Sequence, residues 1–295
     1  MVEVAVVGSL NHDITVWVPH RPAPDETMHG DRVAEFRGGK GANQAVAAAR
    51  LGARVSMVGA VGDDARGTFL VDGLAAEGID HSHVVRADEP TGVAVITVDP
   101  EDVSIIVVAG ANGRLSPAHV GEAADVIARA DVLLLQGEVP APTARRAAEL
   151  ARAASTLVVF NPAPFNDVAP AVLPLTDVLV VNRGEAAQVA ELGDRVSAAD
   201  VVVTTLGADG CVVTLRGDVS PTQTSIGAFE AAMVDPTGAG DCFVAALAVA
   251  IGEGRSPVDA ARFAAAAGSL AVEVEGAQPS MPLRSAVEVR LGGAG

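Results

Sequence analysis

Short apolar runs alternate with alanine-rich stretches of helical length through most of this chain. The runs are β-branched or leucine-rich, are often bounded by Gly, Pro or Asn, and fall at residues 4–7, 55–61, 132–135, 157–160, 178–181 and 201–206. The helical stretches fall at residues 42–51, 66–77, 117–129, 142–154 and 185–192. This alternation predicts an α/β fold, a three-layer sandwich with a mainly parallel central sheet, helices on both faces, and ligands at the carboxyl ends of the strands.

Two stretches interrupt the alternation, because each holds strand-like residues with no helix between them. Residues 14–18 run on to Phe36, and residues 93–98 are followed by residues 103–108. Each stretch predicts a hairpin, and together they predict a small β-sheet lid that excludes water from a reacting site. An antiparallel edge of the main sheet would give the same pattern. The expected division is residues 1–13, 36–90 and 110–295 for the main domain, and residues 14–35 and 91–109 for the lid.

The chain is strongly acidic. Twenty Lys and Arg residues stand against 37 Asp and Glu residues, so the formal net charge is −17 over 295 residues. Such an excess repels phosphate backbones and anionic lipid surfaces, and we expect neither nucleic acid nor a membrane as a partner. An anionic substrate would need backbone amides or a helix N-terminus at its binding site.

Cysteine usage and the first residues bear on location. The chain has two cysteines, Cys211 and Cys242, and its histidines show no metal-ligand spacing apart from a loose His81-x-His83 pair. A strand-like run begins almost at once, without the basic-then-apolar pattern of a signal peptide. No apolar run reaches the roughly 18 residues that would indicate a membrane span. We therefore expect a cytoplasmic protein with reduced thiols.

The basic residues are almost all arginine. Of the 20, Lys40 is the sole lysine, and it lies in the glycine-rich segment Gly38-Gly39-Lys40-Gly41-Ala42-Asn43. Either this position requires lysine where other positions accept arginine, or one lysine has survived by chance. The first interpretation makes Lys40 a candidate functional residue.

A second glycine-rich segment precedes an apolar helix. It reads Asp235-Pro236-Thr237-Gly238-Ala239-Gly240-Asp241-Cys242-Phe243. The small residues allow close backbone approach, and the free N–H groups and positive dipole end of the helix point back at the loop. The segment predicts an anion hole in which Asp241 could accept a proton from a hydroxyl beside a bound phosphate. An ordinary capping Asp after a glycine turn would give the same sequence.

Both segments resemble the signatures of the ribokinase-like carbohydrate kinases, the PfkB family. The first resembles the N-terminal signature when extended to Gln44, and the second is similar to the C-terminal signature. Further motifs follow the family's order: Gly8-Ser9-Leu10-Asn11-His12-Asp13, Thr91-Gly92-Val93-Ala94, Ala109-Gly110-Ala111-Asn112, Asn161-Pro162-Ala163-Pro164, Thr205-Leu206-Gly207 and Gly276-Ala277-Gln278-Pro279-Ser280. The resemblance implies transfer of the ATP γ-phosphoryl group to a sugar's primary hydroxyl, and its form with Lys40 and Asn43 implies the 5-hydroxyl of D-ribose.

The resemblance also implies roles at the reacting end. Asp241 is the implied general base, and the amides of Gly238, Ala239, Gly240 and Asp241 are the implied anion hole for the transferring phosphoryl group. The implied sugar-binding positions are Asn11, Asp13, Gly39, Lys40, Gly41, Asn43, Glu138 and Asp241. Plainer interpretations remain: Asp13 as a turn residue, Asn43 as a first-turn helix residue and Glu138 as a solvated loop residue.

On the nucleotide side, the implied ATP-binding positions are Asn182, Thr205, Leu206, Gly207, Gly210 and Gly240. Glu185 is implied to act on Mg²⁺ through water, and a helix first-turn acid is the alternative. The chain departs from the family in two places. Arg183 stands where a second acid is common, and residues 192–200 lack the length of a helix. Both departures bear on nucleotide affinity and Mg²⁺ handling.

A monovalent-cation site is implied as well. The matching positions, most of them through backbone carbonyls, are Asp235, Thr237, Ala271, Val274, Gly276 and Ser280. Carbonyl and carboxylate oxygens suit a hard cation, and K⁺ is the implied activator.

The residues leave other functions open. A kinase of another sugar or of a nucleoside would share the fold, but a nucleoside base usually stacks on aromatic rings, and the chain is 3% aromatic with no Tyr. A catalytically silent sugar- or nucleotide-binding protein would not need a base such as Asp241. A dinucleotide-dependent oxidoreductase would place Gly-x-Gly-x-x-Gly after the first strand, where this chain has Gly8-Ser9-Leu10-Asn11.

The lid sequence predicts a partner. Apolar residues occupy both faces of the strand at residues 105–108, which a lid covered on one side would not need. We expect a homodimer that forms through the lid sheets.

Overall fold

The computed structural model describes residues 1–101, 103–193, 199–217 and 220–293. Their strands form a nine-stranded sheet in the order β13-β12-β11-β10-β9-β8-β1-β4-β5 and a separate four-stranded sheet in the order β3-β2-β6-β7. The strands of the large sheet are β1 (Glu3–Val7), β4 (Arg54–Gly62), β5 (Asp80–Ala87), β8 (Val132–Leu135), β9 (Leu157–Phe160), β10 (Val178–Asn182), β11 (Val201–Thr205), β12 (Cys211–Leu215) and β13 (Thr222–Ile226). Pairing is parallel from β5 to β11 and antiparallel for the last two pairs, so the predicted mainly parallel sheet is confirmed.

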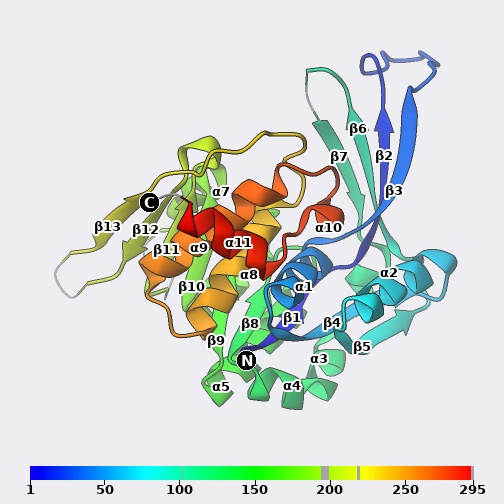
Figure 1. Cartoon of the computed structure of the whole chain (residues 1–295). Helices are drawn as coiled ribbons and strands as arrows, with labels where there is room; N and C mark the ends of the chain where they lie inside the picture. Colours follow the sequence, from blue (N-terminus) through cyan, green and yellow to red (C-terminus); the bar gives the residue numbers. More distant parts are fainter. Residues whose placement is uncertain (102, 194–198, 218–219, 294–295) are drawn as a thin grey trace.

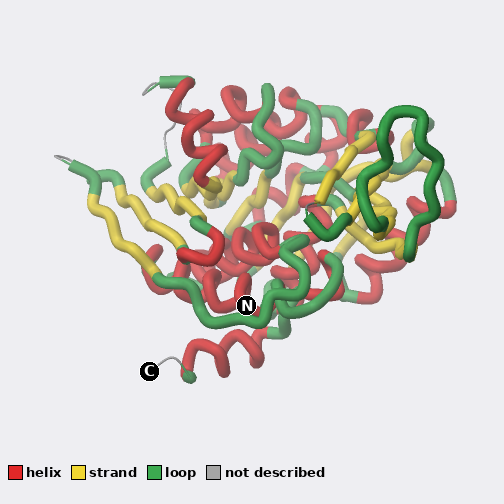
Figure 2. The backbone as a smooth tube through the Cα atoms, turned by 90° about the horizontal axis from the view of Figure 1, so that it is seen from above, coloured by secondary structure: helices red, strands yellow, loops and turns green. Residues whose placement is uncertain are grey.

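Helices cover both faces of this sheet, which gives the predicted three layers (Figure 2). The α-helices are α1 (Lys40–Arg50), α2 (Ala65–Ala76), α3 (Pro117–Glu122), α4 (Ala124–Arg129), α5 (Ala141–Ala154), α6 (Val168–Val172), α7 (Arg183–Glu191), α8 (Ala239–Gly252), α9 (Pro257–Ala271), α10 (Ala277–Ser280) and α11 (Arg284–Gly292). Short 3-10 turns, η1 (Gly110–Arg114), η2 (Leu173–Leu175) and η3 (Gly207–Asp209), complete the order. None of the helices in the described ranges is long and apolar enough to cross a membrane.

The side-chain alternation of β1 explains the two cores. Val4 and Val6 pack with α1, α8 and α9 in one cluster, while Ala5 and Val7 pack with α3, α4, α5 and α6 in the other. Since both faces of a central strand are buried, such strands are apolar at every position. β8 is buried at all four residues for this reason.

The predicted lid is a separate sheet, and the alternative of an antiparallel edge on the main sheet is excluded. It consists of β2 (Asn11–Trp17), β3 (Arg32–Gly38), β6 (Gly92–Val98) and β7 (Val103–Val108). Each predicted hairpin is antiparallel, and β2 joins β6 in parallel. The sheet projects from the main body (Figure 1). Its strands begin at Asn11 and end at Gly38, three residues beyond each end of the predicted segment 14–35, so β2 carries site residues into the lid.

Other predictions needed correction. Residues 117–129 form two helices, because Ala123 between them has φ −93° and ψ 9° and interrupts the helical backbone. Strands β5 (DHSHVVRA) and β13 (TQTSI) were not predicted, because polar side chains conceal the apolar pattern of a buried strand. Strand β12 (CVVTL) was also not predicted, although its sequence is mostly apolar. In the segment 192–200, predicted to be shorter than in the family by the length of a helix, residues 194–198 lie outside the described residues.

Candidate active site

The site forms where the carboxyl ends of β1 and β8 meet the N-termini of α1 and α8. β1 and β8 are neighbouring parallel strands, so the loops that follow them lie at one edge of the sheet. Helices α1 and α8 pack side by side above that edge. Their first turns carry Lys40 and Asp241, and the loop after β8 carries Glu138. The parallel topology thus brings together residues from distant parts of the chain.

Glycines allow α1 to begin this close to the first strand. Gly39 has φ +89°, and a Cβ there would lie 2.6 Å from the Asn11 amide nitrogen. A Cβ on Gly41 would lie 2.6 Å from the Ser9 amide nitrogen. The backbone approach is therefore possible only for glycine at both positions.

Glu138 is held at the N-terminus of α1. Its Oε2 atom accepts the Lys40 amide at 3.1 Å and the Ser9 hydroxyl. A carboxylate at a helix N-terminus is stabilised by the helix dipole and by the free amides of the first turn. Glu138 is therefore a fixed acceptor rather than a solvated loop residue.

The Asp241 carboxylate is buried and bound on both oxygens. Its Oδ2 accepts Asn43 Nδ2 at 2.9 Å, and its Oδ1 accepts Gln44 Nε2 at 3.2 Å. Asp241 is 6% exposed, and it occupies the first turn of α8 after Gly238, whose φ is +79°. The two hydrogen bonds fix the plane of the carboxylate.

Two buried acceptors beside Asp241 have no hydrogen-bond partner. Among the described residues, these are Oδ1 of Asp13 and Oδ1 of Asn43. Burial, and then the negative charges of Glu138 and Asp241, raise the pKa of Asp13 to about 7, although Lys40 opposes the shift. Unsatisfied buried acceptors are costly, so this end of the site is prepared for a ligand with several hydroxyl donors.

Lys40 lies among four carboxylates. The charge of Asp241 is the largest cause that raises the pKa of Lys40, and Glu138, Glu185 and Asp13 act in the same direction. The ammonium therefore stays protonated in spite of burial, which alone would lower its pKa. A fixed positive charge beside Asp241 can bind a phosphoryl group in an otherwise acidic protein.

A cavity of about 240 Å³ joins Lys40 to the start of α8. Gly238, Gly240, Asp241 and Glu185 are among its lining residues. The Ala239 amide donates to the Pro236 carbonyl at 3.2 Å, so of the predicted anion-hole residues it is the one turned into the loop. Helix first-turn amides and a lysine around a cavity form a site for phosphate.

A larger and more apolar cavity continues past Gly240. It has a volume of about 430 Å³, and Thr205, Gly207 and Gly210 at the end of β11 contribute to its wall. Most other lining residues are small or apolar, among them Ala208, Ala228, Phe229, Met233, Phe243 and Gly268. Leu206 is not part of this wall, and its amide instead donates to the Gly210 carbonyl at 2.8 Å. The small and apolar lining suits an apolar group next to the cavity that Lys40 lines.

Glu185 caps the N-terminus of α7 and also lines the cavity that contains Lys40. It forms a capping box with Asn182, in which Glu185 Oε2 accepts the Asn182 amide at 2.9 Å and Asn182 Oδ1 accepts the Glu185 amide at 2.8 Å. Burial raises the pKa of Glu185 above its usual value, although the hydrogen bond from the Asn182 amide and the charge of Lys40 oppose the shift. Carboxylate oxygens of Glu185 and Asp241 on one cavity are of the type that Mg²⁺ binds. Arg183 points elsewhere, to an exposed ion pair with Asp209 at 2.7 Å.

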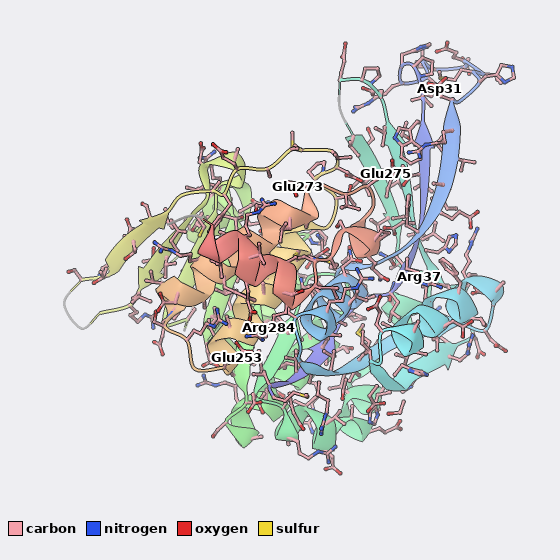
Figure 3. The ribbon with its side chains drawn as sticks, in the orientation of Figure 1. Asp31, Arg37, Glu253, Glu273, Glu275 and Arg284 are labelled. Atoms are coloured by element: carbon pink, nitrogen blue, oxygen red, sulfur yellow. The ribbon has the colours of Figure 1, made fainter. Side chains whose placement is uncertain are left out.

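The Asp235 carboxylate joins the two segments of the predicted cation site. Its Oδ1 accepts the Thr237 amide and its Oδ2 accepts the Gly276 amide, both at 2.8 Å. The Val272 carbonyl, just past the end of α9, accepts the Val234 and Asp235 amides. A helix C-terminus favours a cation, which fits the backbone positions predicted at Ala271, Val274 and Ser280. Glu275 of this segment lies beside the lid (Figure 3). It pairs with Arg32 of β3 at 2.6 Å.

Neither cysteine is suited to catalysis. Cys242 is fully buried, and burial followed by the charge of Asp241 holds its pKa well above the usual range. Burial raises the pKa of Cys211 to about 11. A thiol with such a pKa is a poor nucleophile at neutral pH. Among the described residues no group of three or more His, Cys, Asp and Glu side chains could hold a metal ion.

Sequence reasoning missed part of the polar network around the site. Asn112 donates to Asn11 Oδ1 at 2.8 Å and to the Leu10 carbonyl at 3.0 Å, which fixes the start of β2. Gln136 donates to Gln44 at 2.7 Å. Asn112 and Gln44 belong to the sequence motifs described above. Gln136, directly after β8, belongs to none of them.

Comparison with known proteins agrees with this geometry. The family model described as pfkB family carbohydrate kinase matches residues 1–284. The ribokinase of Bacillus subtilis is 38% identical over 297 residues, covering 98% of this chain and 99% of the relative, and the ribokinase of Haemophilus influenzae is 38% identical over 296 residues, covering 95% of each. The structure of Arabidopsis thaliana ribokinase complexed with ribose and ATP has a TM-score of 0.88 at 34% identity and 99% coverage of both chains. The fold, the paired glycine segments and the family match establish that this chain belongs to the pfkB family of carbohydrate kinases.

Proposed function

We propose that this kinase transfers the γ-phosphoryl group of ATP to the 5-hydroxyl of D-ribose. The observation that carries the proposal is the pair of unpartnered buried acceptors, Asp13 Oδ1 and Asn43 Oδ1, beside Asp241 and Lys40. A small neutral polyol supplies the donors that these atoms lack, and it leaves no apolar group to bury. The named relatives, which are ribokinases, support ribose as the polyol.

In the proposed reaction, Asp241 accepts the proton of the 5-hydroxyl as the hydroxyl oxygen attacks the γ-phosphorus. The bond from the γ-phosphorus to the β,γ-bridging oxygen breaks, and ADP leaves with that oxygen. Asn43 and Gln44 hold the Asp241 carboxylate in one orientation for this step. Lys40 and the first-turn amides of α8 stabilise the negative charge of the transferring group. Asn11, Gly39, Gly41 and Glu138 complete the sugar-binding set.

Mg²⁺ with ATP is the proposed metal. Glu185 and Asp241 line the phosphate cavity and would hold it, Glu185 through water. When bound, Mg²⁺ neutralises charge on the nucleotide phosphates. Asn182, Thr205, Leu206, Gly207 and Gly210 form the proposed ATP side.

K⁺ is the proposed activator. The loop tied together by Asp235 leads directly to Gly238, so a cation ordered there would hold the anion hole in shape. The proposed ligand positions are Asp235, Thr237, Ala271, Val274, Gly276 and Ser280.

We further propose a homodimer through the lid. In β7, Ile105, Ile106 and Val108 are 56%, 66% and 58% exposed, so the outer strand offers apolar side chains on both faces. Light scattering at micromolar concentration should show a dimer, and a monomer would contradict it. We also propose a cytoplasmic location, since Cys211 and Cys242 are free thiols.

The test is a coupled ADP-release assay with ATP and Mg²⁺ across ribose, 2-deoxyribose, fructose, other pentoses and adenosine, each with and without K⁺. Strong turnover on ribose that K⁺ raises is the expected result. Turnover on another substrate would support the kinase activity and contradict ribose as the substrate. No ADP release with any of these substrates would contradict the proposal and favour a sugar- or nucleotide-binding protein.

A further inference from the structure

Two fully buried glutamines form a chain that ends on the Asp241 carboxylate. Gln136 Nε2 donates to Gln44 Oε1 at 2.7 Å, and Gln44 Nε2 donates to Asp241 Oδ1 at 3.2 Å. Both glutamines are 0% exposed. One comes from α1, a helical turn after Lys40, and the other follows β8, two residues before Glu138. The chain therefore connects the two elements that also present Lys40 and Glu138.

The charge of Asp241 sets the direction of this chain. An ionised carboxylate accepts hydrogen bonds and donates none, so Gln44 must turn its NH₂ group toward Asp241. Its carbonyl then faces Gln136, which must also present its NH₂ group. As a result Gln136 Oε1 is buried without a partner, in a space that a Cβ on Gly8 would fill. An orphaned buried carbonyl is unfavourable, which indicates that the bond to Asp241 decides the arrangement.

We propose that Gln44 and Gln136 are positioning residues for the general base. Asn43 binds one oxygen of Asp241 and Gln44 binds the other, so the carboxylate plane is fixed from both sides. Asp241 also lines the cavity shared with Lys40, Gly238 and Gly240. Gln136 acts through Gln44, because it holds the amide that touches Asp241 and does not touch Asp241 itself.

This inference rests on the proposed role of Asp241 as the base. The charged groups that interact with Asp241 are Lys40 from α1, Asp13 from β2 and Glu185 from α7. Glu138, from the loop after β8, acts in turn on Lys40 and Asp13. None of these changes in a glutamine variant. A fall in kcat of such a variant would therefore report the lost amide donor.

The test compares Gln44→Met, Gln136→Met and the double variant with the wild-type enzyme in the ribose assay. Misplacement of a reacting group by a fraction of an ångström to one ångström costs up to about 100-fold in rate, so we expect kcat to fall about 10- to 100-fold for Gln44→Met with the KM values little changed. Gln136→Met should lower kcat less. The double variant should be no worse than Gln44→Met alone, since both act through one contact.

The control is Thr143→Val. Thr143 lies in α5, away from the site, and is also 0% exposed. Its hydroxyl donates to the Leu115 carbonyl at 2.6 Å. A loss of kcat in Gln44→Met no greater than in this control, or multiplicative effects of the two glutamine changes, would overturn the proposal. Failure of both glutamine variants to fold would also overturn it, because the amides would then serve the core.

Asp241→Asn separates this inference from the proposed function. If Asp241→Asn keeps its turnover, the proposed mechanism itself fails. If Asp241→Asn is inactive while Gln44→Met turns over like the wild type, the mechanism stands and the positioning role of the glutamines is overturned.

Discussion

The two ends of the active-site cleft are built in opposite ways. At the sugar end, charged and amide side chains from different elements are buried and locked by hydrogen bonds, as Asp241 is by Asn43 and Gln44. At the nucleotide end, small and apolar residues surround a cavity of about 430 Å³. On the proposed assignment, we expect the sugar end to select by hydrogen bonding and charge, and the nucleotide end to select by the fit of an apolar group. Substitutions should therefore be severe at the first end and mild at the second.

The largest effect should come from Asp241→Asn. A general base contributes about 10²–10⁴-fold in rate, so kcat should fall by that factor while the Kd for ribose stays close to that of the wild type. Turnover by the ADP assay and binding by calorimetry check this. Asp259→Asn is the matched control, because Asp259 holds the same first-turn position in α9 but is exposed. Equal losses in both variants would reduce Asp241 to a helix-capping residue.

Asp13 gives the sugar end a pH dependence. Its folded-state pKa of about 7 lies above its ordinary value of 3.8, so the folded protein retains a proton that the unfolded chain releases. The free energy of unfolding should fall as pH rises between these values, by at most about 1.4 kcal/mol per pH unit, and level off above them. Urea unfolding of the unliganded wild type should show this fall of the free energy of unfolding with pH, and Asp13→Asn should lack it. Saturating ribose should flatten it, because hydroxyl donors favour the ionised carboxylate.

An identical pH dependence in wild type and Asp13→Asn would remove Asp13 as its source. It would also remove one of the two acceptors on which the polyol assignment depends.

The loop between the two ends should respond to a single methyl group. Gly238 has φ +79°, and a Cβ there would lie 2.9 Å from the Ala277 Cα atom. Gly238→Ala should therefore displace the anion-hole loop and lower kcat about 10-fold. Gly254→Ala is the control, because Gly254 has φ +84° and nothing within 4 Å of a Cβ. If both variants lose only stability, the loop position does not matter for turnover.

The same contrast explains what could be predicted from the sequence. Strands β8 and β9 were predicted residue for residue, because a strand buried on both faces is apolar throughout. Strand β5, DHSHVVRA, was missed because at the sheet edge its exposed positions are polar. Local composition therefore predicts the centre of the sheet better than its margins.

Within the candidate site, residues in local glycine-rich segments could be predicted, and contacts that depend on strand register could not. Lys40, Asn43 and Asp241 lie in glycine-rich segments whose conformation is visible locally, and the structure brings them together. The bond between Gln136 and Gln44 joins residues 92 positions apart and needs the register of β8 against β1. Whether Glu138 is a solvated loop residue or a fixed acceptor also depended on this register.

The smallest effect is expected at the nucleotide end. Gly268 lines the large cavity from α9, and a Cβ there would make ordinary contacts of 3.6 Å with the Ala239 carbonyl and 3.8 Å with Phe243. Gly268→Ala should raise stability by about 0.5–1 kcal/mol, because glycine is unfavourable inside a helix, and the KM for ATP should change less than about threefold. Thermal melts and ATP titrations check both values. A large rise in the KM for ATP would mean that the nucleotide fits its cavity as closely as the sugar fits its own, and the contrast between the two ends would not hold.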